Sequence, residues 1–175
     1  MTQSTNLPIA ADMTPSVDDE ETLSGLAATE RLASRLSRIA RLGDIVCLSG
    51  ELGTGKTTFA RSFIRSRASR AGIEISEVPS PTFTLVQTYE MPQGDIWHFD
   101  LFRLEHPGET LELGIGDALN GGICLVEWPD RLPEDSLGAR LDLAFAFGTT
   151  EDERHVKIVG DAAWRGRLAE FIGNE

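Results

Sequence analysis

The sequence predicts an α/β protein, a three-layer sandwich whose central sheet is mixed and largely parallel. A short apolar run at residues 45–48 leads through a glycine-rich turn into a helical segment at residues 55–71. A second, fully apolar run at residues 123–126 is typical of a strand buried on both faces of a parallel sheet. In residues 141–147 a large apolar side chain instead occupies every second position, which predicts a half-buried antiparallel strand.

The composition fits one domain with a substantial core, because 41% of the 175 residues are hydrophobic. No apolar run approaches the roughly 18 residues that span a bilayer, and the N-terminus lacks the features of a secretory signal. We therefore expect a cytoplasmic protein with no membrane partner. Cys47 and Cys124 lie in apolar runs without a second Cys or His at ligand spacing, which favours buried reduced thiols over a disulfide or metal site.

The net charge of −12 is unevenly distributed. Residues 31–70 hold nine Lys and Arg against two acids, so the rest of the chain is strongly acidic. The overall acidity argues against non-specific nucleic-acid binding. The basic segment is explained most simply by solvated helix faces, with an acidic or polyanionic partner as the alternative.

The N-terminal part of the chain predicts an extension followed by a helix. Residues 1–20 are acidic, contain no Lys or Arg and show no apolar periodicity, so we expect a disordered extension before a single domain at residues 21–175. A helix is expected over residues 24–42 with Ser24 as its N-cap. Its apolar residues recur at i, i+4 and i+7; these are Leu32, Leu36 and Ile39.

The remaining elements follow in order. The helix at residues 55–71 should end at Gly72. Pro79 and Pro81 predict an extended approach to a strand at residues 83–89, which forms a hairpin with residues 95–100. A short helix started by Pro107, a strand at 123–126, an antiparallel pair at 141–147 and 154–159, and a closing helix at 162–172 complete the prediction.

The turn between the first apolar run and its helix matches G-x-x-x-x-G-K-T, the phosphate-binding P-loop, in the strand–helix setting that the motif requires. Glycines let the backbone N–H groups surround a phosphate, and the helix start adds positive potential. Lys56 should reach the β/γ-phosphates of ATP, and the Thr57 hydroxyl should complete the shell of a Mg²⁺ ion. The alternative is a glycine-rich turn by chance. The predicted binding residues of the loop are Gly50, Gly53, Thr54, Gly55, Lys56, Thr57 and Thr58.

Two acids end apolar runs, where ligands bind in this kind of sheet. Glu127 follows residues 123–126 and Asp100 follows residues 96–99, so both are candidates for catalysis and for Mg²⁺, although acids also occur there as turn residues. Thr82 and Thr84 are either switch hydroxyls near the phosphate or ordinary strand threonines. His98 is more consistent with a strand histidine than with a base.

Five blocks of the sequence together resemble the TsaE family, small bacterial P-loop ATPases of tRNA threonylcarbamoyladenosine synthesis. The resemblance covers roughly residues 22–160, and the Ser-Pro-Thr and Val-Glu-Trp-Pro blocks discriminate far better than the P-loop does. The blocks are residues 50–58, 80–86, 98–104, 113–115 and 125–129.

The resemblance implies a P-loop NTPase-like fold and slow hydrolysis of ATP with Mg²⁺, faster when the protein docks on the TsaB–TsaD complex. That complex attaches threonylcarbamoyl to N6 of adenosine 37 in tRNA, and ATP turnover would reset it. The partner tRNA would therefore be met either indirectly or at a shared surface. The resemblance places the magnesium-side acid on Glu127 and a further essential acid on Asp100. It also places Thr82 and Thr84 in a switch-like segment and Trp128 beside the site.

Two other functions remain open at this stage. A small-molecule or nucleotide kinase would need an arginine-bearing lid, whereas the arginines of this chain cluster before residue 71. A non-enzymatic, nucleotide-dependent RNA-binding module would use the basic helix faces. The arginines concerned are Arg31, Arg35, Arg38, Arg61 and Arg65.

Overall fold

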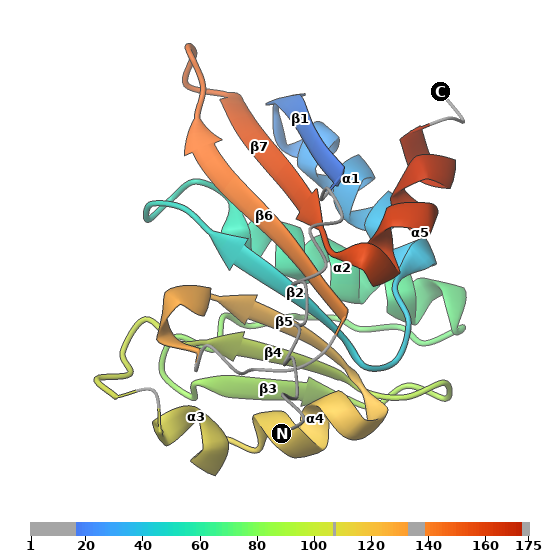
Figure 1. Ribbon diagram of the computed structural model, residues 1–175, viewed down its shortest axis with the longest axis vertical. Coiled ribbons are helices and arrows are strands. Elements are labelled where there is room, and N and C mark those ends of the chain that lie inside the picture. Colours follow the sequence, from blue (N-terminus) through green and yellow to red (C-terminus); the bar gives the residue numbers. More distant parts are fainter. Residues whose placement is uncertain (1–16, 107, 133–138, 173–175) are drawn as a thin grey trace, which may run out of the picture.

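The structure, a computed structural model, describes residues 17–106, 108–132 and 139–172 as a seven-stranded sheet between two layers of helices (Figure 1). The strands are β1 (Val17–Ser24), β2 (Asp44–Ser49), β3 (Val86–Tyr89), β4 (Ile96–Asp100), β5 (Ile123–Glu127), β6 (Ala139–Phe147) and β7 (Glu153–Gly160). The helices are α1 (Leu26–Ile39), α2 (Lys56–Arg70), α3 (Glu109–Glu112), α4 (Ile115–Gly121) and α5 (Ala162–Ile172), with a 3₁₀ turn, η1, at Pro129–Arg131.

The sheet has the order β1-β7-β6-β2-β5-β4-β3. Its four central strands, β6, β2, β5 and β4, run parallel to one another, while β3, β7 and β1 pair antiparallel at the two sides. This arrangement confirms the predicted mixed, largely parallel sheet. The carboxyl ends of β2, β5 and β4 therefore lie at one edge of the sheet, where a parallel sheet binds its ligands.

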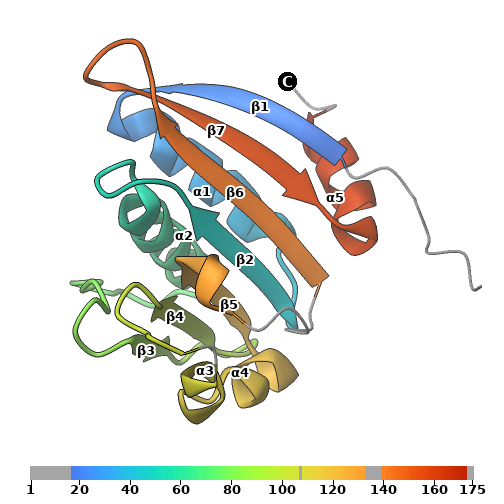
Figure 2. The same cartoon turned by 60° about the vertical axis from the view of Figure 1, so that its left-hand side comes forward.

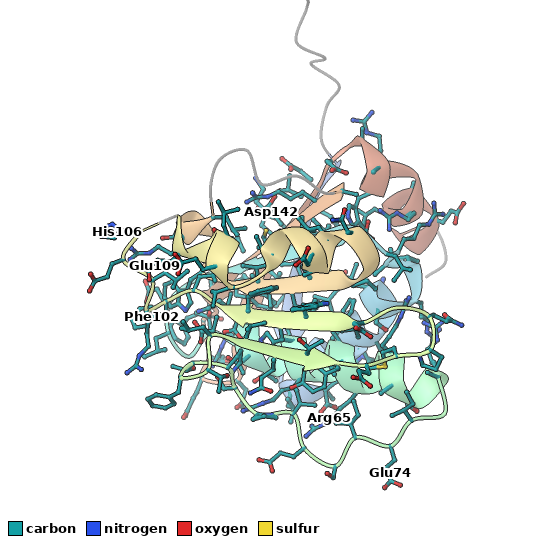
Figure 3. The ribbon with its side chains drawn as sticks, turned by 90° about the horizontal axis from the view of Figure 1, so that it is seen from below. Arg65, Glu74, Phe102, His106, Glu109 and Asp142 are labelled. Atoms are coloured by element: carbon teal, nitrogen blue, oxygen red, sulfur yellow. The ribbon has the colours of Figure 1, made fainter. Side chains whose placement is uncertain are left out.

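The two helical layers enclose separate apolar cores. Helices α1, α2 and α5 cover one face, and α3 and α4 cover the β5–β4 part of the other face (Figures 1 and 2). Figure 3 shows this layering from below, with the sheet between α2 and the pair α3 and α4. The apolar stripe of α1 enters the larger core through Leu32 and Leu36, as its spacing predicts. Among the described residues no helix is long and apolar enough to cross a membrane.

The N-terminal prediction needs two corrections. Residues 17–20 are not an extension, because they begin β1, which pairs with β7 over its full length. Ser24 ends that strand, so it does not cap α1; the N-cap is Gly25, which has a positive φ of +76°. Residues 1–16, also predicted to be disordered, lie outside the described part of the chain.

The strand direction predicted for residues 141–147 is half wrong. β6 is antiparallel to β7 but parallel to β2, where Leu141 pairs with Val46 and Leu143 with Leu48. Alternation arises because helices cover one face of β6 and leave the other face open to solvent, whichever way the neighbouring strands run. Strand direction is therefore independent of this pattern.

Two further segments differ from prediction. Residues 81–84 form a turn closed by the Leu85 N–H on the Pro81 carbonyl at 2.7 Å, so β3 begins at Val86 and not at residue 83. The hairpin of β3 and β4 is confirmed. α3 is a single turn, and α4, which was not predicted, follows it and ends at Gly121. Pro107, the predicted start of α3, lies outside the described residues.

The two thiols are free and buried, as predicted. They lie on adjacent strands, Cys47 on β2 and Cys124 on β5, on the face that α4 covers. Burial raises the pKa of each thiol to about 12. Since the thiolate is the reactive form, both cysteines are inert at neutral pH.

A buried ion pair fixes the end of β2 remote from the glycine-rich turn. Asp44 begins β2, and Arg167 on α5 reaches it with two hydrogen bonds, at 2.5 Å and 3.0 Å. The Arg41 N–H donates to the same carboxylate at 2.7 Å, and Arg167 also donates to the carbonyl of Ile39 at 2.9 Å. These contacts connect α5 to the α1–β2 junction.

Substituting Arg167→Met is expected to lower the free energy of unfolding by about 3–5 kcal/mol, because it leaves the Asp44 carboxylate buried without its charged partner. Urea denaturation measures this loss. A matched control is Arg140→Met, which removes a half-exposed pair with Asp142 and should cost less than about 1 kcal/mol. Equal losses in the two variants would contradict this assignment.

Candidate functional site

The glycine-rich turn lies at the carboxyl end of β2 and rests on the neighbouring strand β6. Gly50 has a φ of +128°, and a Cβ at this position would collide with the carbonyl oxygen of Phe145. Only glycine fits here, because the backbone is in the left-handed half of φ space and there is no room for a side chain. Gly50 therefore fixes where the loop leaves the sheet.

The loop closes onto the start of α2. Gly55, with a φ of +110°, is the N-cap of this helix, and the first-turn N–H groups that follow lack intrahelical acceptors. Inside the loop, the buried Thr54 hydroxyl donates to the Glu51 carbonyl at 2.8 Å. A 15-residue helix that begins on such a loop offers an anion both N–H donors and the positive end of the helix dipole.

Lys56 is held inside the loop and is 4% exposed. Its Nζ donates to the carbonyl oxygens of Gly50 at 2.7 Å and Glu51 at 2.8 Å, and lies 4.2 Å from the ring centroid of Trp128. Burial lowers the pKa of Lys56, while the carboxylates of Glu127 and Asp100 oppose this shift. An ammonium has three donors, so one remains for a phosphate oxygen.

A chain of hydrogen bonds runs from α2 through β5 to β4. The Thr57 hydroxyl donates to Glu127 Oε2 at 2.9 Å, and Glu127 Oε1 lies 2.9 Å from His98 Nε2. Glu127 and His98 are both buried, at 2% and 0% exposure. A hydroxyl has one proton and two lone pairs, so Thr57 can donate to Glu127 and still offer oxygen to a cation.

Asp100 is the second buried acid and lies beside Glu127 on the neighbouring strand, since these two residues pair in the β4–β5 register. Its Oδ2 accepts from the Thr82 hydroxyl at 2.9 Å, and its Oδ1 accepts from the Phe102 N–H at 3.1 Å. The Ser80 hydroxyl lies 2.8 Å from that of Thr82. The proline-bounded turn is therefore tied to the acid at the end of β4.

Two residues beside these acids have backbone conformations that non-glycine residues seldom adopt. Trp128 directly follows Glu127 with φ +60° and ψ +56°, and Leu85 follows the threonine turn with φ +67°. Such strain costs about 1–3 kcal/mol per residue and is concentrated at functional sites. The Trp128 ring also lies 4.8 Å from that of Phe102, centroid to centroid.

One cavity of about 420 Å³ brings most of the predicted residues together. Its predicted lining residues are Gly53, Gly55, Lys56, Thr57, Thr58, Thr82, Asp100, Glu127 and Trp128. Gly50 lines an adjoining cavity that shares Leu52 and Trp128 with the first one. The Thr54 side chain points into the loop, where its hydroxyl donates to the Glu51 carbonyl. Thr84 lies apart from both, because it is exposed and its hydroxyl accepts from Gln87 Nε2 at 3.1 Å.

Three lining residues were not predicted, namely Leu52, Phe102 and Arg103. Figure 3 shows Phe102 at the end of the sheet where the site lies, and it is half exposed. Arg103 lies with its guanidinium carbon 4.6 Å from the ring centroid of Phe83. Phe102 and Arg103 come just after the end of β4. Residues at the carboxyl end of a parallel strand are candidates for a ligand site, so this position could have predicted them.

The side chains fit Mg²⁺ that arrives with a polyphosphate rather than a metal held by protein alone. Among the described residues, no group of three or more His, Cys, Asp and Glu could hold a metal ion. Mg²⁺ is usually bound by one or two protein oxygens together with substrate phosphates and water. The Thr57 hydroxyl and the Glu127 and Asp100 carboxylates supply oxygens of this kind on the lining of the cavity.

Several arginines of the basic segment have structural partners. The Arg61 Nε donates to the Val78 carbonyl at 2.8 Å, and Arg67 donates to the Ser37 carbonyl at 2.7 Å. Arg35 pairs with Glu21 at 3.6 Å. Arg65 is exposed and points away from the sheet on the outer side of α2 (Figure 3). The basic faces are thus only partly available to a partner.

Comparisons with known proteins agree on one family. The family model described as "Threonylcarbamoyl adenosine biosynthesis protein TsaE" matches residues 23–156. A Rickettsia conorii protein named "tRNA threonylcarbamoyladenosine biosynthesis protein TsaE" is 42% identical over 109 residues, which cover 62% of this chain and 60% of that protein. A Bacillus subtilis protein of the same name is 34% identical over 130 residues, 73% and 77% of the two chains.

The fold has a solved counterpart as well. A crystal structure of Bacillus subtilis YdiB superposes with a TM-score of 0.66 at 25% sequence identity, over 90% of this chain and 95% of that one. The matches to the Rickettsia conorii and Rickettsia felis proteins span 60% and 57% of their lengths.

Proposed function

The chain belongs to the TsaE family, and from this premise we propose that it is a Mg²⁺-dependent ATPase that acts in the formation of N6-threonylcarbamoyladenosine at position 37 of tRNA. The observation that carries the proposal is the cavity where a P-loop lysine, a P-loop threonine and two strand-end acids converge. The family name supports the pathway, and the cavity supports the chemistry.

Binding of ATP would fall to the loop and to the start of α2. The first-turn N–H groups and Lys56 Nζ would hold the β- and γ-phosphates, and the Gly50 and Gly55 conformations keep the loop open for them. Mg²⁺, when bound with ATP, would neutralise the charge that develops on the phosphates during transfer. The Thr57 hydroxyl, which donates a hydrogen bond to Glu127, would supply a protein ligand to the ion.

Asp100 would orient the attacking water. Each carboxylate oxygen can accept two hydrogen bonds, and the described contacts use one on each, from Thr82 and Phe102. The carboxylate therefore keeps accepting capacity on the cavity side. Because Thr82 and Phe102 fix the side chain from two elements, a water molecule bound there would be held in one orientation.

Docking on the TsaB–TsaD complex would regulate this hydrolysis and reset that complex between cycles. Two large apolar side chains of the cavity lining are exposed, Leu52 at 80% and Phe102 at 50%. Phe83, at 79% exposure, contacts the lining residue Arg103. Apolar side chains grouped at a site mark surfaces that bind partners. A partner that covered them would also exclude water, which strengthens the electrostatic interactions with the phosphates.

The test measures ATP hydrolysis with and without purified TsaB and TsaD, beside mass spectrometry of the modified tRNA. We expect the partners to stimulate hydrolysis about tenfold or more, a change of about 1.4 kcal/mol in the barrier. Omitting this protein should stop repeated rounds of modification. No stimulation together with no effect on modification would contradict the proposal, and phosphorylation of a small metabolite would favour a kinase.

A further inference from the structure

Glu127 and Asp100 differ in how their side chains are supported. Asp100 is held by a backbone N–H and by Thr82, both from segments next to it in space. Glu127 is held by Thr57, which belongs to the P-loop helix, and by His98, which lies on β4 in the sheet. Thr82, Phe102 and Thr57 all line the cavity, whereas His98 does not, so only Glu127 has a support that lies outside it.

His98 is enclosed in the protein, with 0% of its surface exposed. It lies between its strand partners Gln87 on β3 and Leu125 on β5, and two residues before Asp100 on the same face of β4. The face it shares with Ile96 is the one that packs against α2. The imidazole thus sits beneath the two acids and does not line the cavity.

The hydrogen bonding of this ring points to one task. His98 Nε2 lies 2.9 Å from Glu127 Oε1, and a carboxylate can only accept, so Nε2 carries the proton. Among the described residues, Nδ1 has no hydrogen-bond partner although it is buried. Buried polar atoms in folded proteins nearly always have hydrogen-bond partners. A buried histidine with one unpaired ring nitrogen therefore requires an explanation.

We propose that His98 is the positioning residue for Glu127, holding the carboxylate in place as Thr57 and Glu127 receive the Mg²⁺ that accompanies ATP. The proposal rests on the proposed function. Thr57 must share its hydroxyl oxygen with the ion, whereas the donor from His98 lies outside the cavity and is unaffected by ligands. His98 therefore keeps one carboxylate oxygen fixed and turns the other toward Thr57 and the cavity.

Metal sites in other proteins depend on the residues that support their ligands. Residues that hydrogen-bond to metal ligands orient those ligands, and their loss typically costs about 10–100-fold in metal affinity or activity. Leu or Phe would pack in this apolar surrounding without leaving a nitrogen unpaired, but neither could donate to Glu127. The imidazole is therefore explained by the carboxylate it contacts and not by packing.

The test compares His98→Gln with His98→Asn and His98→Leu. The side-chain amide nitrogen of Gln can occupy the place of Nε2, whereas that of Asn stops at the place of Nδ1 and cannot reach Glu127. The readout is binding of the ATP analogue AMP-PNP in EDTA and across a Mg²⁺ titration, with ATP hydrolysis measured in parallel. Circular dichroism and a thermal melt establish which variants fold.

We expect all folded variants to bind AMP-PNP in EDTA as the wild type does, because the loop is unchanged. His98→Asn and His98→Leu should need about 10–100-fold more Mg²⁺ to tighten binding, and kcat should fall more than KM rises. His98→Gln should behave like the wild type. If His98→Leu does not fold, the Gln and Asn pair still decides the question.

Two outcomes overturn the proposal in different ways. A folded His98→Asn or His98→Leu protein with the wild-type Mg²⁺ dependence shows that His98 does not position Glu127, while the proposed ATPase function stands. A wild-type protein that binds no AMP-PNP at any Mg²⁺ concentration refutes the proposed function and this inference with it.

Discussion

The Lys56→Ala variant is expected to lose nucleotide binding and hydrolysis together. Lys56 is buried in the loop and joins the Gly50 and Glu51 carbonyls, so its removal takes away both a charge for the phosphates and a contact that shapes the loop. Removing one preorganised electrostatic contact to a transition state costs about 100–1000-fold in rate. We expect at least that loss in partner-stimulated hydrolysis, with ATP binding by calorimetry strongly weakened.

The loss should occur without unfolding. Burial lowers the pKa of Lys56 despite the opposing acids, so the folded state binds this proton less tightly than the unfolded state does. Below its folded-state pKa the charged lysine therefore carries a cost in stability, and that cost lessens as pH rises through that pKa toward the unfolded value. Lys56→Ala removes this cost, so its Tm should not fall far.

The chain offers a matched control, because its other lysine lies outside the loop and does not line the cavity. Lys157 on β7 is about half exposed and pairs with Asp18 at 3.5 Å. Lys157→Ala should leave ATP binding and stimulated hydrolysis unchanged. Wild-type binding by Lys56→Ala, or an equal loss in both variants, would contradict the placement of ATP in the P-loop.

The central part of this site could be predicted because its signals are local. The glycine spacing dictates the loop, and acids that end apolar runs must meet at one edge of a parallel sheet. The structure places Lys56, Thr57, Asp100 and Glu127 around one cavity, as that rule requires. No knowledge of tertiary contacts was needed for these four positions.

Other features depend on partners that are distant in sequence. β1 is acidic and lacks apolar periodicity, yet it forms a strand because β7 supplies its hydrogen-bonding edge. Leu23 is its buried contribution to the core, and the polar residues beside it face solvent or α1. A strand at the side of a sheet needs few apolar residues of its own, so composition alone suggested an extension.

Contacts within the site also depend on residues that are distant in sequence. The contact between His98 and Glu127 joins residues on neighbouring strands, and their pairing became visible only through the β4–β5 register. Thr82 reaches Asp100 because the Pro81 turn curls the segment back, whereas two prolines predicted an extended chain. Sequence patterns therefore located the groups and did not show how they contact one another.

Glu127→Gln is expected to reduce hydrolysis about 100–1000-fold while leaving Mg²⁺-free ATP binding intact. Glu127 accepts hydrogen bonds at both oxygens, from Thr57 and from His98. An amide can accept on one side only. If its oxygen keeps the His98 contact, its NH₂ faces Thr57 and must donate to that hydroxyl, which then loses its acceptor and keeps one free lone pair in place of two. The substitution is nearly equal in size, so packing changes little.

The measurement separates this effect from a general loss of the site. ATP binding in EDTA should be near the wild-type value for Glu127→Gln, because the loop and Lys56 are unchanged, while the Mg²⁺ requirement and kcat should both shift. Asp142→Asn, which alters a carboxylate on the outer face of β6, is the matched control and should behave as the wild type.

Asp100→Asn should also lower kcat, since water orientation needs the carboxylate. Normal stimulated hydrolysis by both Glu127→Gln and Asp100→Asn would show that these acids do not serve the reaction.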